Sequence, residues 1–126
     1  MKDRSAAEIE VEALAADYCR ALHHSDADRL EALCHDRYFM TSAGEGDGPV
    51  FFDKEAFVAR VRNRPPFAGD PAFEILSVDV EGDEMAEVKL WVDLPPRRFR
   101  DFLGFYRVGG EWRLVTKLFR TASGAV

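Results

Sequence analysis

Asp101 is the residue whose type and position point most directly to chemistry. It lies in the first of two runs, 97–108 and 111–122, that are rich in aromatic and β-branched residues and are separated by a Gly-Gly pair. This arrangement predicts a β-hairpin, in which side chains alternate between two faces of a sheet. Asp101 then shares a face with residues that are nearly all apolar: Phe99, Leu103, Phe105, Trp112, Leu114, Thr116 and Leu118. Because burying a carboxylate without a partner is costly, we expect Asp101 to have a hydrogen-bonding partner or a ligand in the core.

The register, in which Val108 and Glu111 close the turn, also assigns the remaining hairpin residues to the two faces. Arg120 falls on the same face as Asp101, where it could reach that carboxylate or an anionic ligand at the rim. The opposite face mixes cationic and apolar residues: Arg98, Arg100, Phe102, Tyr106, Arg113, Val115 and Lys117. Its apolar area is large enough to be covered by a second copy of the chain, so we expect a homodimer that pairs through this face of the sheet.

Two further side chains could join Asp101. Tyr18 lies on the apolar stripe of a helix predicted over residues 6–24, and His35 lies where a second, short helix meets the first strand. Tyr18 could be a packed tyrosine with a satisfied hydroxyl, or a donor to a ligand. His35 could titrate near neutral pH and act as an acid–base group, or it could hold the helix–strand joint by bonding a backbone carbonyl.

These side chains depend on an order of elements that periodicity, capping residues and Gly or Pro breaks predict. Three helices with one short strand among them are followed by four consecutive antiparallel strands. This order predicts an α+β fold, a curved sheet with helices on one face, in a single domain of residues 1–126. The predicted elements are helices over 6–24 and 25–35, a strand over 37–43, a loop over 44–49, a helix between Asp53 and the Pro65-Pro66 pair, strands over 73–81 and 84–94, and the two hairpin strands.

Composition argues against several classes of partner. The formal charge of −6 disfavours nucleic acid and anionic membranes. The chain has no apolar run of about 18 residues and no signal-peptide core, so we expect a cytoplasmic protein that crosses no membrane. Cys19 and Cys34 lack metal-binding spacing and the 44–49 loop lacks a phosphate-binding pattern, so no metal and no cofactor is expected. His23 and His24 are expected at an exposed helix end.

Several segments carry a resemblance to a known family. They are the Tyr-Cys-Arg-Ala-Leu run from Tyr18 with the Ser-Asp-Ala-Asp after it, Leu-Cys-His-Asp at 33–36, Phe-Arg-Asp-Phe at 99–102, and Gly-Gly-Glu-Trp-Arg-Leu-Val-Thr-Lys at 109–117. With them the chain resembles the nuclear transport factor 2-like (NTF2-like) superfamily over nearly its whole length, and most of all its lumazine-binding-like branch. The resemblance implies a cone-shaped, curved antiparallel sheet with three N-terminal helices on its concave face.

The superfamily includes ketosteroid isomerases and polyketide cyclases, and the similarity to the isomerases implies roles for two residues. Tyr18 falls where those enzymes place a tyrosine that donates to a developing oxyanion. Asp101 falls where they place a protonated carboxylic acid that also donates. The isomerases have a general-base aspartate near the end of the first strand, where this chain has Thr-Ser-Ala at 41–43, so ketosteroid isomerase activity is not expected.

We therefore expect a protein that binds a small, partly hydrophobic molecule in an apolar cone with a few polar groups. One alternative is an isomerase, cyclase or lyase with His35 as the acid–base group and Tyr18 and Asp101 as oxyanion donors. Another is a structural dimer module without a ligand. The candidate ligand-binding residues are Tyr18, His35, Phe39, Phe99, Asp101, Trp112 and Arg120.

Overall fold

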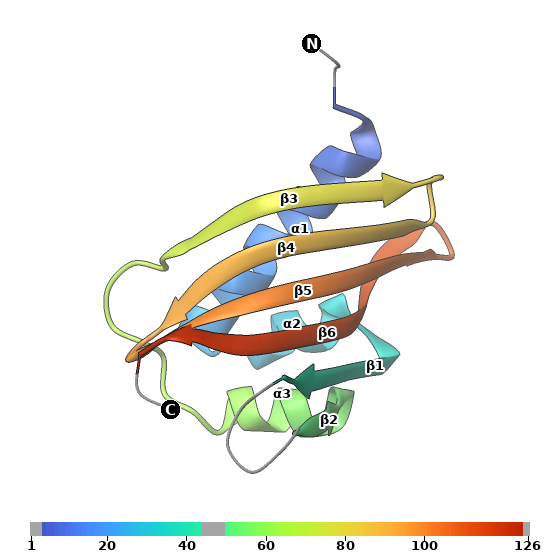
Figure 1. The fold of residues 1–126 in the computed structure, drawn as a ribbon. Coiled ribbons are helices and arrows are strands. Elements are labelled where there is room, and N and C mark those ends of the chain that lie inside the picture. Colours follow the sequence, from blue (N-terminus) through green and yellow to red (C-terminus); the bar gives the residue numbers. More distant parts are fainter. Residues whose placement is uncertain (1–3, 44–49, 125–126) are drawn as a thin grey trace.

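The structure is a computed structural model that describes residues 4–43 and 50–124. The glycine-rich segment predicted as a loop, 44–49, lies outside the described residues. Within them the chain forms three helices and six strands (Figure 1). The helices are α1 (Ala6–His24), α2 (Ala27–Leu33) and α3 (Lys54–Arg62), and the strands are β1 (Cys34–Ser42), β2 (Phe51–Asp53), β3 (Phe73–Glu81), β4 (Met85–Leu94), β5 (Arg97–Val108) and β6 (Glu111–Ser123).

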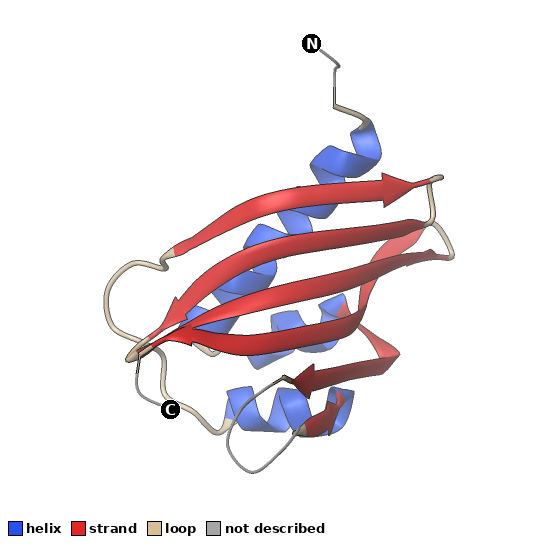
Figure 2. Cartoon of the chain, viewed as in Figure 1, coloured by secondary structure: helices blue, strands red, loops and turns tan. Residues whose placement is uncertain are grey.

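The strands form one curved, open sheet in the order β2-β1-β6-β5-β4-β3. The helices lie on one side of it (Figure 2), which confirms the predicted α+β fold class. Neighbouring strands are antiparallel except β1 and β6, which pair in parallel. A parallel pair needs a long connection, and the chain supplies one that contains α3 and four strands, β2 to β5. The short strand β2 was not predicted.

Each helix begins at a residue whose side chain can cap it. Ser5, Asp26 and Asp53 each accept a hydrogen bond from the backbone N–H three residues later, at 2.9–3.1 Å. These bonds satisfy backbone donors that have no partner within the helix. The cap at Asp53 is the predicted one, and it places α3 against β1 and β2 (Figure 1).

The predicted boundary between the second helix and the first strand is wrong. The helix α2 ends at Leu33, and β1 begins at Cys34. The backbone is already extended at Cys34, whose N–H still bonds back to Leu30. His35 is therefore the second residue of β1, two residues beyond the end of α2, close to where the helix meets the strand.

The predicted exposed end of α1 is wrong for His23 and confirmed for His24. The His23 side chain is buried, and its Nε2 lies 2.8 Å from the carbonyl oxygen of Gly69. The backbone N–H of Phe67 donates to the carbonyl of His23 at 2.9 Å. The segment that follows α3 thus folds back over the end of α1 and covers one of its two histidines.

The core lies between the helices and the inner face of the sheet. Alternating residues of β4 and β5 point inward, as the hairpin pattern predicts, and α1 packs against β3 and β4. Apolar burial of this kind supplies most of the driving force for folding. Fully buried members of the core include Val11, Tyr18, Leu30, Val88, Leu90, Leu103 and Leu114.

A β-bulge in β6 changes which residues face this core. Starting at the turn, the predicted register holds as far as the pair Phe105 and Leu114. Next, Gly104 pairs with Thr116, so Val115 is an extra residue in β6. Because side chains alternate along a strand, one extra residue exchanges the two faces for everything beyond it.

Lys117 and Phe119 consequently turn to the inner face, and Leu118 turns outward. The predicted placement of Lys117 on the outer face is wrong, since its side chain is only 8% exposed. Arg120 lies on the outer face, so the expectation that it shares a face with Asp101 is also wrong.

Candidate ligand-binding site

A cavity of about 480 Å³ lies between α3, the inner face of the sheet and the connection from β4 to β5. Its size falls within the range of small-molecule pockets. Asp101 and Lys117 reach it from the sheet, and Arg60, Arg64 and Arg97 line it as well. Its walls are otherwise largely apolar and include Met40, Phe52, Phe57, Val61, Phe99 and Phe119.

Asp101 is fully buried at this cavity. Its Oδ2 accepts a hydrogen bond of 2.6 Å from the hydroxyl of Tyr18, which comes from α1. Its Oδ1 is also buried, and it has no hydrogen-bond partner among residues 4–43 and 50–124. The expectation of a partner for Asp101 is confirmed on one oxygen, and the second oxygen is left without one.

Lys117 is the polar residue of this site that the sequence did not reveal. Its Nζ lies 3.8 Å from Asp101 Oδ2, within ion-pair range. The rings of Phe119, Phe57 and Tyr18 surround the same nitrogen, with centroids 4.8–5.4 Å away. Burial lowers the pKa of Lys117, although the charge of Asp101 acts in the opposite direction. Only the bulge in β6 brings this amine inside.

Tyr18 acts on the site through Asp101. It is completely buried and is not among the residues that line the cavity. Burial, followed by the charge of Asp101, raises its pKa well above the usual value, so the phenol keeps its proton. This neutral hydroxyl donates to Asp101 Oδ2 and thereby fixes the orientation of the carboxyl group. The other oxygen, Oδ1, takes no part in this hydrogen bond.

Of the other candidate residues, Phe99 lines this cavity, and His35, Phe39, Trp112 and Arg120 do not. The Nδ1 of His35 accepts a hydrogen bond of 3.0 Å from the backbone N–H of Arg37, and His35 is not part of the lining. Phe39 points to the outer face. Trp112 is buried elsewhere and donates from Nε1 to Glu10 at 3.1 Å. Arg120 lies outside, as described above.

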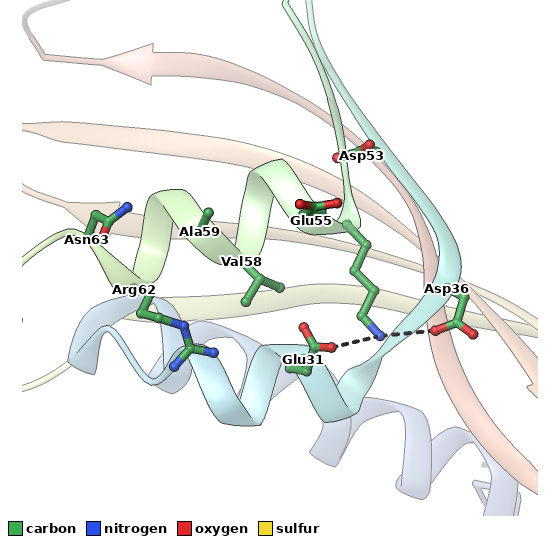
Figure 3. A pocket seen from close by; sticks show the side chains of 9 residues that line it. Glu31, Asp36, Asp53, Glu55, Val58, Ala59, Arg62 and Asn63 are labelled. Carbon is green, nitrogen blue, oxygen red and sulfur yellow. Dashed lines mark hydrogen bonds and ion pairs between the residues drawn. The ribbon is translucent and has the colours of Figure 1, made fainter.

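A second hollow, of about 550 Å³, lies on the surface between α2 and α3 (Figure 3). It is lined mainly by charged residues, and several of them already pair with one another. Lys54 Nζ lies 3.7 Å from Glu31 and 3.3 Å from Asp36, and Arg62 lies 3.0 Å from Asp28. These pairs join α3 to α2 and β1, so we assign the hollow a structural role.

Within residues 4–43 and 50–124, no group of three or more His, Cys, Asp or Glu side chains is placed to hold a metal ion. Cys19 and Cys34 are buried free thiols, and burial raises the pKa of Cys34 to about 12. Such thiols pack as small apolar groups. Of the helices in the described part of the chain, none has the length and hydropathy needed to span a membrane.

Comparison with known proteins places these features in context. The profile of a family described as "Putative lumazine-binding" matches residues 6–120. No curated protein sequence matches the chain.

Several solved structures share the fold. An NTF-2 like protein of unknown function from Silicibacter pomeroyi has a TM-score of 0.80 and 29% identity, over 88% of this chain and 92% of that one. An NTF2-like protein of unknown function from Methylobacillus flagellatus has a TM-score of 0.81 and 18% identity, over 96% and 97%. A ketosteroid isomerase-like protein from Erwinia carotovora atroseptica has a TM-score of 0.76 and 16% identity, over 95% and 99%. The last two likenesses concern the fold alone.

Proposed function

This chain belongs to the putative lumazine-binding family of NTF2-like proteins, and we propose that it binds a small, partly hydrophobic molecule in the cavity beside Asp101 and Lys117. The supporting observation is the buried Oδ1 of Asp101, which lacks a hydrogen-bond partner among the described residues. An unsatisfied buried polar group costs about 1–3 kcal/mol. A ligand N–H or O–H that reached Oδ1 would remove that cost.

Lys117 offers the complementary interaction. At 3.8 Å its Nζ is within ion-pair range of Asp101 but too far for a hydrogen bond, so its N–H groups can donate to a ligand oxygen. The cavity thus pairs one acceptor with one donor at the sheet and surrounds them with aromatic and aliphatic walls. A molecule with one polar edge and an apolar body matches this arrangement.

Binding without turnover fits the geometry better than the isomerase, cyclase or lyase alternative. That alternative needs His35 as an acid–base group at the ligand, and His35 is not among the residues that line the cavity. It also needs the Tyr18 hydroxyl as a donor to the ligand, and this hydroxyl already donates to Asp101. The homodimer through the outer face and the cytoplasmic location stay predictions.

The proposal is tested with two fluorescent probes that differ in one donor. N-phenyl-1-naphthylamine is apolar and has a single N–H, and its N-methyl derivative has none. We expect saturable binding of the first probe, about 10-fold or more tighter than the second, because hydrogen bonds to charged groups contribute about 1.5–3 kcal/mol. In Asp101→Asn the amide oxygen can accept from Tyr18 and leave an NH₂ facing the cavity, so the preference should disappear.

Two results would overturn the proposal. One is the absence of saturable fluorescence enhancement with either probe at micromolar protein. The other is an unchanged preference in a folded Asp101→Asn variant. Asp79→Asn is the control for a carboxyl-to-amide change in the same sheet, because Asp79 lies on β3 and is not part of the cavity lining.

A further inference from the structure

We propose that the ligand is a carboxylic acid, whose carboxylate binds Arg60 and Arg64 while its apolar part enters the cavity toward Asp101. This inference rests on the proposed binding function and adds the chemical class of the ligand.

Charge is distributed unevenly around the cavity. The chain as a whole carries a formal charge of −6. Among the described residues that line the cavity, however, four are cationic and Asp101 is the only acid. Lys117 is the cation within ion-pair range of Asp101. A local excess of positive charge in an acidic protein attracts an anion to this opening and repels one over most of the surface.

Arg60 and Arg64 form the part of this excess that no described acid neutralises. Neither makes an ion pair with any residue in 4–43 or 50–124. Arg60 lies in the last turn of α3 and Arg64 lies two residues beyond the end of that helix, so both positive charges face the same cavity. Burial, followed by the charge of Arg60, lowers the pKa of Arg64. A bound carboxylate would relieve this repulsion.

The two guanidinium groups are held at the cavity by contacts that leave donors available. Arg64 Nη2 donates to the carbonyl of Leu22 at 2.6 Å, and its guanidinium lies 4.9 Å from the ring centroid of Phe67. The Arg60 guanidinium lies 5.3 Å from the centroid of Phe52. Such contacts orient planar guanidinium groups before a ligand arrives, and Arg binds carboxylates through paired N–H donors.

Arg62, the last residue of α3, provides an internal comparison with Arg60 on the same helix. It faces the hollow between α2 and α3, and it pairs with Asp28 at 3.0 Å. The arginine on this side of the helix thus has an acidic partner, whereas the two at the cavity have none among the described residues. The apolar and aromatic cavity walls further favour an acid with a ring or a chain over a strongly hydrated polyanion.

The experiment compares 4-phenylbutyrate with the neutral 4-phenylbutanamide as displacers of N-phenyl-1-naphthylamine. We expect the acid to displace the probe at about 10-fold or more lower concentration than the amide, with a preference that weakens as salt is added. Arg60→Gln and Arg64→Gln should each reduce the preference, and the double variant should abolish it. Arg62→Gln, the matched control, should keep it. Arg60 is exposed, so its variant is expected to fold even if Arg64→Gln does not.

Equal displacement by acid and amide in the unmodified protein would overturn the inference and leave the binding function intact. So would an equal loss of preference in Arg62→Gln. Failure of the probe itself to bind would instead count against the binding function. The two failures are therefore distinguishable in one titration series.

Discussion

Lys117 carries its amine into the core, where water cannot solvate it fully. Lys117 Nζ lies 3.8 Å from Asp101, and three aromatic rings surround this nitrogen. Burial has the largest effect on its pKa and lowers it; Asp101 and the thiols Cys34 and Cys19 raise it, and Arg64 lowers it further. A buried lysine of this kind weakens the folded state, which is the pattern expected where a polar group serves a ligand.

This arrangement predicts a particular dependence of stability on pH. Between the lowered folded-state pKa of Lys117 and its ordinary value of 10.5, the unfolded chain binds more protons than the folded one. The contribution of Lys117 to the free energy of unfolding should therefore rise with pH across that window. Urea unfolding of the unmodified protein and Lys117→Met, from about pH 7 to pH 10, isolates this contribution.

The comparison with Lys117→Met is needed because Tyr18 has the opposite effect. Its raised pKa makes stability fall as pH rises above its ordinary value of 10.0. That effect is present in both proteins and cancels in the difference. A difference in unfolding free energy that stays flat, or that shrinks as pH rises, would contradict the placement of Lys117 in a desolvated site.

At the scale of elements, the bulge in β6 decides the composition of the site. It makes Val115 an extra residue and turns Lys117 inward. On the neighbouring strand, Gly104 pairs with Thr116, and a Cβ atom at Gly104 would overlap Thr116 Oγ1. A glycine inside a strand often marks a bulge or a close approach, so Gly104 was a usable signal for this feature.

We predict that Gly104→Ala lowers the free energy of unfolding by about 1–3 kcal/mol, as expected for overpacking. Thr116→Ala in the same chain should restore most of it, because that change removes the overlapping hydroxyl. Thr116→Ala alone should have little effect, since this side chain is exposed. Urea denaturation of the four proteins measures the coupling. Additive effects would show that the clash does not determine the stability of this pair.

At the scale of the whole molecule, no layer formed by residues 4–43 and 50–124 covers the outer face of the sheet. The helices all lie on the inner side (Figure 2). Phe39, Phe102, Tyr106 and Leu118 are exposed on the outer side by 38–47%. Because of the bulge, Leu118 lies on the outer face and Lys117 does not. The observed outer face is therefore more apolar than the predicted one. Contiguous apolar area of this kind is typical of an interface.

We predict a homodimer at micromolar concentration by sedimentation. Phe102→Glu and Leu118→Glu should each shift the protein to monomer, because a twofold interface would bury both copies of the new charge. Ile9→Glu is the control, since Ile9 is 56% exposed on α1. A monomeric unmodified protein, or equal dissociation by the Ile9 variant, would rule out the outer face as the interface.

The sequence by itself determined the features that depend on neighbouring residues. The cap at Asp53, the Gly-Gly turn and the alternation that points Asp101 inward are local. The partnership of Tyr18 with Asp101 was also predictable, because both lie on the apolar faces of their elements. The α+β class followed from the order of those elements.

Tertiary structure alone decided which groups meet at the cavity. The bulge placed Lys117 inside and Arg120 outside, and packing of α3 against the sheet brought Arg60 and Arg64 to the same opening. His35 is not among the residues that line this cavity. These outcomes depend on contacts between segments that are far apart in the chain. Local patterns of residue types do not predict the energies of such contacts.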